Sequence, residues 1–190
     1  MNTQKYILNK YKVAQDATYP LKLNIKKRDL CFLFKELGFK VGIEVGVDMG
    51  HTSEEICLIN PELKLYSIDP WMDEYKSHEE VARERLKPYN CEIIKKTSME
   101  AVKDFEPNSI DFVYIDGDHS FDCVLEDLTE WSKIVRKDGL VSGHDYLYVN
   151  HSHRRKPVRV AVDKYLKENG IEKFFMVNKN NQSSWFFIKK

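Results

Sequence analysis

The stretch VGIEVGVDMGHTS (residues 41–53) decides the fold, because it joins an apolar run to a glycine turn and then to residues that start helices. Its first part, residues 41–46, predicts a buried strand. Gly46 allows the backbone to turn sharply and a ligand to come close, and Thr52 or Ser53 can cap the helix that follows. The free amides at the start of such a helix favour a negatively charged group. A glycine turn also joins many ordinary strands and helices, so its meaning depends on the rest of the chain.

Strand and helix patterns alternate from this turn to the end of the chain. The segments with strand character are 41–46, 63–69, 91–96, 110–116, 139–145, 174–177 and 185–188. The segments with helical character are 30–37, 52–59, 73–87, 98–105, 120–135 and 157–168. This alternation predicts an α/β fold, a Rossmann-like three-layer sandwich with a mostly parallel seven-stranded sheet. The polar stretch 178–184 predicts a hairpin loop, which makes the C-terminal pair of strands antiparallel.

Residues 1–25 have the weakest pattern and predict an N-terminal arm before one domain, residues 26–190. Apolar residues near the start of the arm could form a short helical stripe. Pro20 and the residues after it favour an extended connection. Such an arm could cover a substrate site or pair with a second copy of the chain in a homo-oligomer.

The charge of the chain is balanced, since it has 30 lysines and arginines and 30 aspartates and glutamates. General binding to nucleic acid or to a membrane surface requires an excess of basic residues, so we expect neither partner. The N-terminus lacks the continuous apolar core of a signal peptide, and no apolar run approaches the roughly 18 residues of a membrane span. We therefore expect a cytoplasmic protein.

An acidic residue follows the glycine turn at the end of the next predicted strand. Asp69 lies 23 residues after Gly46, and its carboxylate could accept hydrogen bonds from both hydroxyls of a ribose. This pair indicates a nicotinamide dinucleotide or S-adenosylmethionine (SAM). A dinucleotide fingerprint requires G-x-G-x-x-G, whereas Gly42, Gly46 and Gly50 lie four residues apart. The carboxylate of Asp48 would repel a pyrophosphate but suits the positive charges of SAM, so the pattern favours SAM.

Polar residues crowd the ends of two later strands. Asp116, Asp118 and His119 follow the fourth predicted strand, and His144 and Asp145 end the fifth. In parallel sheets, ligands bind beyond the carboxyl ends of the strands, where these residues should meet. His119 would start a helix, whose positive dipole end favours neutral imidazole, so it is a candidate general base. A local alternative is that Asp118 or Ser120 caps the helix and His119 is a solvated residue of its first turn.

Four stretches resemble class I SAM-dependent methyltransferases, and among them the bacterial metal-assisted O-methyltransferases of sugars and small molecules. These stretches are IEVGVDMGHTS (43–53), YSIDPW (66–71), IDFVYIDGDHSFDCVLEDLTEWSKIVRKDGLVSGHDY (110–146) and PVRVAVDKYL (157–166). The resemblance implies that residues 26–190 form a SAM-dependent methyltransferase domain.

The resemblance also implies a set of cofactor-binding residues. They are Glu44 and Gly46 at the methionine end of SAM, Asp69 at the ribose with Pro70 and Trp71 beside it, and Ser98 and Met99 at the adenine. Asp116 is a further candidate, because its carboxylate could contact the amino group of SAM. Trp71 and Met99 are also explained by simple core packing.

The resembling metal-dependent enzymes carry an aspartate at the position of Asp116 and an acidic or amide pair after the fifth strand. Here that pair is His144 and Asp145, so the implied metal ligands are Asp116, His144 and Asp145. The implied ion is Mg²⁺ or Mn²⁺. Mg²⁺ prefers oxygen ligands, whereas imidazole is more typical of Mn²⁺, Fe²⁺ or Zn²⁺. His144 therefore departs from the pattern, and it could instead be a second base or a ligand of the acceptor.

These patterns together predict methyl transfer from SAM to an oxygen of a small-molecule acceptor, a sugar or a phenol. His119 would act as general base with Asp116 beside it, and a divalent cation at Asp116 and Asp145 would assist. The basic run 151–156 could hold an anionic acceptor. Two other functions stay open, an NAD(P)-dependent oxidoreductase and a non-catalytic SAM-binding protein.

Overall fold

The computed structural model describes residues 2–14, 16–147, 157–179 and 182–190, and it contains one mixed sheet between helices. The strands of this described part are β1 (Leu21–Leu23), β2 (Val41–Val45), β3 (Lys64–Ile68), β4 (Cys91–Ile94), β5 (Ile110–Ile115), β6 (Val135–Gly143), β7 (Phe174–Lys179) and β8 (Gln182–Ile188). The α-helices are α1 (Thr3–Lys10), α2 (Lys27–Glu36), α3 (His51–Ile59), α4 (His78–Leu86), α5 (Ser98–Ala101), α6 (Phe121–Ile134) and α7 (Pro157–Glu168). The 3-10 helices are η1 (Asp73–Tyr75) and η2 (Val102–Asp104).

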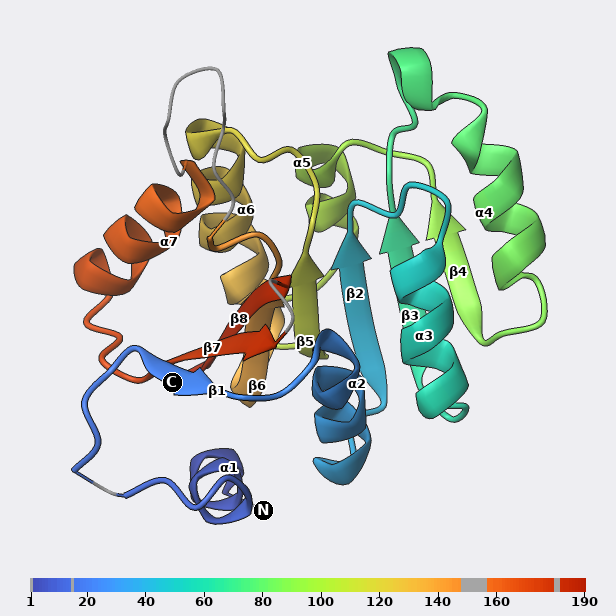
Figure 1. The fold of residues 1–190 in the computed structure, drawn as a ribbon. Coiled ribbons are helices and arrows are strands. Elements are labelled where there is room, and N and C mark those ends of the chain that lie inside the picture. The colour runs from blue at the N-terminus through green and yellow to red at the C-terminus, as the bar shows by residue number, and fades with distance from the viewer. Residues whose placement is uncertain (1, 15, 148–156, 180–181) are drawn as a thin grey trace.

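The strands lie in the order β1-β7-β8-β6-β5-β2-β3-β4 (Figure 1). Strand β8 runs antiparallel to both of its neighbours, and all other neighbouring pairs are parallel. The prediction of a mostly parallel α/β sheet with an antiparallel C-terminal hairpin is therefore confirmed. In the parallel part, consecutive strands are joined through helices, as right-handed crossovers require.

The predicted number of strands was wrong, because the sheet has eight strands and not seven. The additional strand is β1, which pairs in parallel with β7 through Leu21 and Phe175. Its sequence, Leu-Lys-Leu, alternates over only three residues, which is too short to separate a strand from the predicted extended connection. Leu23 is buried and provides the apolar contact that fixes the strand.

The C-terminal hairpin is also longer than predicted. Residues 178–184 were expected to form its loop, but Lys179 pairs with Gln182 and the backbone ladder continues on both sides. Backbone pairing does not depend on apolar side chains, so a polar stretch can still form strands. Ser183 and Ser184 are buried in this arrangement.

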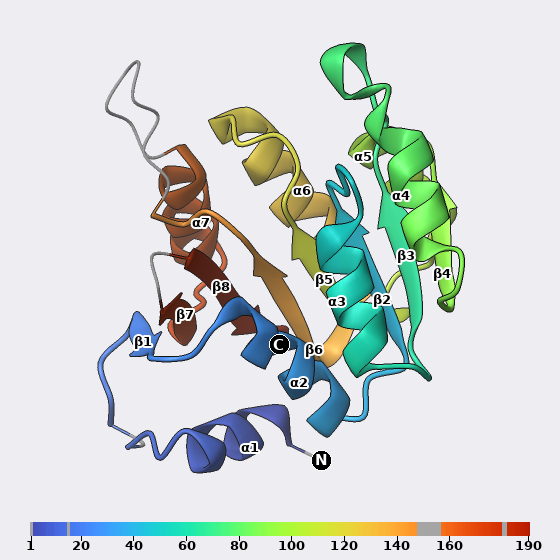
Figure 2. The same ribbon diagram turned by 45° about the vertical axis from the view of Figure 1, so that its right-hand side comes forward.

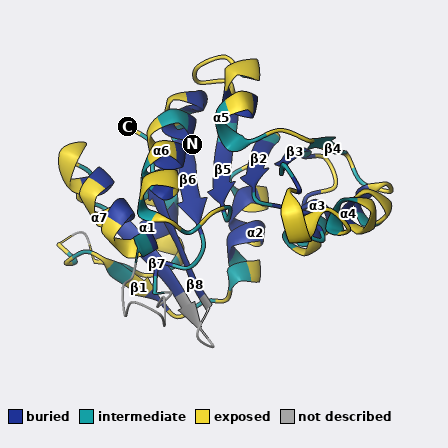
Figure 3. Ribbon diagram, turned by 90° about the horizontal axis from the view of Figure 1, so that it is seen from above, coloured by how far each residue is buried: buried dark blue, intermediate teal, exposed yellow. Residues whose placement is uncertain are grey.

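The two faces of the sheet are covered by different helices. Val113 and Val141 pack on the side of α6 and α7, while Phe112 and Leu140 pack on the side of α2 and α3, as the alternation of side chains along strands requires. Figures 1 and 2 show these two layers of helices. Seen from above in Figure 3, the strands are buried and the outer faces of the helices are exposed. Helix α7 spans the predicted residues 157–168.

Helix α1 lies at the amino end of the central strands, far from their carboxyl ends (Figure 2). The hydroxyl of Thr3 donates a hydrogen bond to the carbonyl of Asp138 at 2.7 Å, and Ile7 is fully buried. The apolar stripe expected in the arm thus faces the core next to α2. Within the described residues, no helix has the length and apolar character needed to cross a bilayer.

Candidate active site

The carboxyl ends of four neighbouring strands bring the predicted site residues to one edge of the sheet. Strands β3, β2, β5 and β6 are adjacent and parallel, so they all end on the same side. Glu44 lies in β2, Asp69 follows β3, Asp116 follows β5 and His144 follows β6. This edge is where ligands bind in open α/β sheets.

Gly46 is required by a close contact between two strand ends. Its φ is 88°, in the left-handed region, and an added Cβ would lie 2.3 Å from the carbonyl oxygen of Asp116. The amide of Asp116 donates to the carbonyl of Val45 at 2.8 Å, and the amide of Gly46 donates to the carbonyl of Ile68 at 2.9 Å. The glycine was predicted to make space for a ligand. The structure shows that it makes space for the chain that leaves β5.

Asp69 ties the glycine turn to the loop after β3. Its Oδ2 accepts hydrogen bonds from the amides of Val47 at 2.8 Å and Asp48 at 3.0 Å, and its Oδ1 accepts one from the amide of Trp71 at 2.8 Å. A carboxylate has about four acceptor positions. One therefore remains for a ligand.

Trp71 lies in a small core under α4. It is 1% exposed, and it packs with Val47, Ala82 and Leu86. Its indole Nε1 donates a hydrogen bond to the carbonyl of Asp48 at 2.9 Å, and this bond holds the backbone that follows Gly46. The structure thus gives Trp71 the core-packing environment that the sequence left as an alternative, while the neighbouring Pro70 is half-buried.

Ser98 makes its polar contacts with α6. Its hydroxyl accepts a hydrogen bond from Nε1 of Trp131 at 2.8 Å and donates one to Asp127. Burial raises the pKa of Asp127 to about 6, and the bond from Ser98 opposes this shift. Met99 beside it is half-buried at the start of α5. The two residues predicted to lie near the adenine therefore form the start of α5, where Ser98 is bonded to α6.

Glu44 is a buried acid in β2, and it is 1% exposed. Ser53 in α3 donates a hydrogen bond to its carboxylate, and the hydroxyls of Ser53 and Ser67 lie 2.9 Å apart. Burial raises the pKa of Glu44 to about 8, although the bond from Ser53 and the charge of Lys27 act in the opposite direction. A carboxyl with this pKa favours its neutral form at pH 7.

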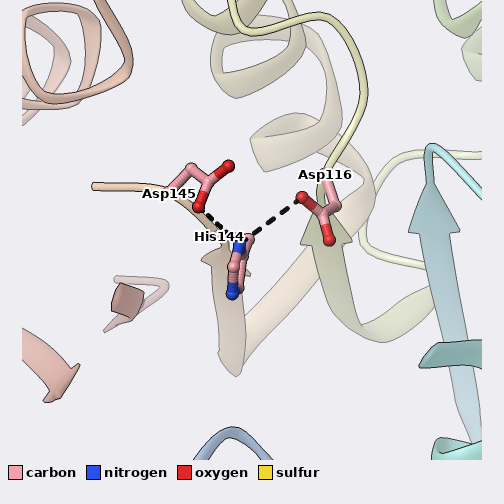
Figure 4. A group of neighbouring side chains, drawn as sticks. All are labelled: Asp116, His144 and Asp145. Carbon is pink, nitrogen blue, oxygen red and sulfur yellow. Dashed lines mark ion pairs between the residues drawn. The ribbon is translucent and has the colours of Figure 1, made fainter. Parts of the chain in front are cut away.

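Asp116, His144 and Asp145 form a compact cluster of metal-ligating groups (Figure 4). One ligand atom of each residue lies within 4.8 Å of the others. Nδ1 of His144 is 2.8 Å from Oδ1 of Asp145 and 3.8 Å from Oδ1 of Asp116. Figure 4 shows His144 between the two carboxylates, with Asp116 coming from the end of β5. The three side chains are 20–25% exposed, so a ligand can reach them.

His119 lies next to this cluster. Its Nε2 is 3.7 Å from Oδ1 of Asp116 and 3.5 Å from Oδ2 of Asp145. The hydrogen bond with Asp116 and the charges of both carboxylates raise the pKa of His119, against the effect of burial. These carboxylates act against the helix dipole, which was expected to favour the neutral imidazole.

Of the two residues expected to cap α6, Ser120 is the N-cap and Asp118 lies in the turn before it. Oδ1 of Asp118 accepts a hydrogen bond from the amide of Ser120 at 2.6 Å. Ser120 is the N-cap of α6, and its hydroxyl accepts from the amide of Cys123 at 3.4 Å. Asp118 is exposed and shapes the turn before the helix. It has no place among the three clustered ligands.

A family model described as a methyltransferase domain matches residues 43–146, which is more than half of the chain. The chain belongs to this methyltransferase family. The match spans the glycine turn, Asp69, the cluster and His119, so the methyltransferase domain contains the whole edge described above. The competing prediction of a nicotinamide-dependent oxidoreductase loses its basis, because the matched family is not a dehydrogenase family.

Solved structures share the fold of this methyltransferase. A candidate caffeoyl-CoA O-methyltransferase from Staphylococcus aureus aligns with a TM-score of 0.70 and 16% identity, over 100% of this chain and 93% of the other. An O-methyltransferase from Bacillus cereus in complex with SAH aligns with a TM-score of 0.65 and 13% identity, over 98% of this chain and 89% of the other. The O-methyltransferase TomG from Streptomyces achromogenes, in complex with SAM, aligns with a TM-score of 0.66 and 15% identity, over 86% of this chain and 79% of the other. A sequence search of curated proteins found no match.

One cation at the site of this methyltransferase, Lys27, was not predicted from the sequence. Nζ of Lys27, at the start of α2, donates to the hydroxyl of Thr52 at 2.6 Å and lies 5.5 Å from the ring centre of Tyr114. Its charge lowers the pKa of Glu44. Lys27 precedes the glycine turn by 19 residues and belongs to no motif, so only the fold could reveal its position. The basic run 151–156 lies outside the described residues.

Proposed function

We propose that the protein transfers a methyl group from SAM to an oxygen of a small-molecule acceptor, a sugar or a phenol. The observation that carries this proposal is the group of two carboxylates and two imidazoles beside the glycine turn. Asp116, His144, Asp145 and His119 lie within 4 Å of one another in successive pairs. A module that only bound SAM would not need this set of acid–base groups.

The charges of the edge suit SAM as the cofactor. SAM carries a positive sulfonium and a positive ammonium, and Glu44, Asp69 and Asp116 surround the glycine turn with acidic groups. The remaining acceptor position on Asp69 can take one ribose hydroxyl. Glu44 can become ionised when the ammonium approaches, because a nearby positive charge favours the carboxylate. The bound SAM and SAH in the TomG and Bacillus cereus structures are consistent with this choice.

The donor set of Asp116, His144 and Asp145 fits a divalent cation. Two carboxylates and one imidazole, with ligand atoms within 4.8 Å of one another, match Mn²⁺ better than Mg²⁺. When bound, such an ion lowers the pKa of an acceptor hydroxyl and stabilises the oxyanion. Asp116 and Asp145 come from neighbouring strand ends, so the rigid sheet sets their separation.

The chain's own residues then handle the proton and the geometry. The acceptor oxygen forms a bond to the methyl carbon, the bond between carbon and sulfur breaks, and its electron pair stays on the sulfur of SAH. The acceptor proton moves to Nε2 of His119, which lies beside both carboxylates. Holding the two reactants in line is itself a large part of such catalysis, and the contact of Gly46 with Asp116 fixes the cofactor turn against the reacting side.

The test is calorimetry of SAM and Mn²⁺ binding together with detection of released SAH on catechol and sugar acceptors. The wild type should bind both and release SAH. Asp145→Ala should lose Mn²⁺ binding and turnover but keep SAM binding. Asp118→Asn is the matched control, because this acid is close in sequence but bonds only within its own turn. SAM binding without turnover on any acceptor would favour a non-catalytic protein, and undiminished turnover in Asp145→Ala would remove the metal from the proposal.

A further inference from the structure

Asp145 has an unusual backbone conformation for a residue in a cluster of ligands. Its φ is 56°, in the left-handed region that non-glycine residues avoid. Aspartate and asparagine enter this region more often than other non-glycine residues, but it remains a strained conformation for them. It persists only where the surrounding structure fixes it. The surroundings of Asp145 should therefore contain the groups that hold it.

The residue before Asp145 is held by β8. The amide of His144 donates to the carbonyl of Ile115 at 3.0 Å, and the carbonyl of His144 accepts from Nε1 of Trp185 at 3.0 Å. Trp185 is fully buried. Its ring lies so close to Gly143 that an added Cβ there would be 2.5 Å from a ring carbon. The indole thus supports the end of β6 from one side.

The residues after Asp145 are held by the same strand. The amide of Tyr146 donates to the carbonyl of Ser183 at 3.0 Å, and the amide of Leu147 donates to the hydroxyl of Ser183 at 3.0 Å. The hydroxyl of Tyr146 donates to Asp163 in α7 at 2.6 Å. Asp145 therefore lies between two anchored segments of chain, and neither segment can move without breaking buried hydrogen bonds.

Two residues of β8 each contribute a side chain to this support, and the backbone carbonyl of one of them, Ser183, makes a further bond. Ser183 and Trp185 are two residues apart, so they point to the same face of the sheet. Ser184 between them points to the other face, where its hydroxyl lies 3.1 Å from that of Tyr114. The strand thus offers a built-in comparison between a serine that contacts the segment around Asp145 and a serine that does not.

We propose that Ser183 and Trp185 are positioning residues that hold His144 and Asp145 in the arrangement needed to bind a divalent cation. They act through the backbone on both sides of Asp145 and touch neither substrate nor cofactor. The inference rests on the proposed function, because it concerns the same cation. It assigns to the antiparallel hairpin, which is remote in sequence from the other site residues, a part in preparing the metal ligands.

The experiment compares Ser183→Ala and Trp185→Phe with Ser184→Ala in the full chain. Mn²⁺ binding is measured by calorimetry and by the electron paramagnetic resonance of free Mn²⁺. Losing a group that orients a ligand typically weakens metal binding by 10–100-fold, so each of the first two variants should bind Mn²⁺ roughly tenfold more weakly. Ser184→Ala also loses a buried hydroxyl contact but should bind Mn²⁺ within about twofold of the wild type. All three should keep the wild-type affinity for SAH.

Two further readings separate positioning from general damage. Urea unfolding without metal should show similar losses of stability in Ser183→Ala and Ser184→Ala, so that only Mn²⁺ affinity distinguishes them. Wild-type Mn²⁺ affinity in a folded Ser183→Ala protein, or equal weakening in Ser184→Ala, overturns the inference while the proposed function stands. Absence of Mn²⁺ binding in the wild type overturns both at once, and this result is recognisable because it appears before any substitution is made.

Discussion

Glu44→Gln should make the protein more stable at alkaline pH. The side chain is buried in β2, and burial raises the pKa of the carboxyl from an ordinary value of 4.5 to about 8. Because the folded-state pKa lies above the unfolded value, the folded state prefers the neutral acid. Its relative stability is complete below about pH 4.5 and is lost progressively as the pH rises to about 8.

The size of the effect follows from the shift. Each pKa unit corresponds to about 1.4 kcal/mol, so a shift of this size places an upper bound of about 5 kcal/mol on the loss for the wild type between these pH values. Glutamine cannot ionise, and its amide oxygen can still accept the hydrogen bond from Ser53. The variant should match the wild type within about 1 kcal/mol at pH 5 and exceed it by roughly 2–4 kcal/mol at pH 8.5.

Urea unfolding followed by circular dichroism from pH 5 to pH 9 measures this difference. The other groups with raised pKa, Asp127 and His119, are common to both proteins and cancel in the comparison. The variant should also bind SAM more weakly, because it cannot present a negative charge to the ammonium. A stability difference that stays constant across the pH range would refute the reasoning, since it would mean that Glu44 ionises alike in both states.

Three further predictions, one of them with a control substitution, test other parts of the structure. Gly46→Ala should lower the free energy of unfolding by more than about 3 kcal/mol or abolish folding, because the new methyl group would lie 2.3 Å from a carbonyl oxygen. The control Gly38→Ala, at a positive φ with open space around it, should lower it by about 1 kcal/mol in chemical unfolding. Equal losses of stability would contradict the close contact at Gly46. Trp71→Phe should lower stability by about 1–2 kcal/mol through loss of the hydrogen bond to Asp48, and SAH calorimetry should show weaker binding if this bond shapes the turn. Asp127→Asn should be roughly 1–3 kcal/mol more stable than the wild type at pH 8 and equal to it at pH 4, because burial raises the pKa of this acid to about 6. Urea unfolding curves at the two pH values measure the difference, and a gain in stability at pH 4 would contradict the predicted titration of Asp127.

The central strands and the amphipathic helices were predictable because their patterns are long. The strand at 110–116 contains the apolar run 112–115, and the stripe of Val124, Leu128 and Trp131 on α6 is buried as its spacing predicts. Leu21–Leu23 carries too few residues for a pattern, so its place at the edge of the sheet depends on contacts with β7 that are remote in sequence.

The sequence predicted where the site lies in the fold, but it did not predict the hydrogen bonds that its side chains make. Strand ends could be aligned from the sequence, so the meeting of Asp116 with Asp145 was expected. The hydrogen bonds of a side chain depend on what folds over it, and this explains why Asp69 binds backbone amides and Ser98 binds Asp127. The upward pKa shift of His119 could not be predicted, because the helix start is visible in the sequence, whereas the distance to the carboxylate of Asp145 is not.

The contact of Gly46 with the carbonyl of Asp116 has a consequence for how the enzyme can diversify. The two halves of the edge meet there with room for a hydrogen atom and nothing larger. New acceptors can be accommodated by changing loops farther out, but any substitution at this point would push the cofactor turn and the chain after β5 apart. This close contact therefore keeps the glycine turn and the chain after β5 together, while loops farther from it are free of this constraint.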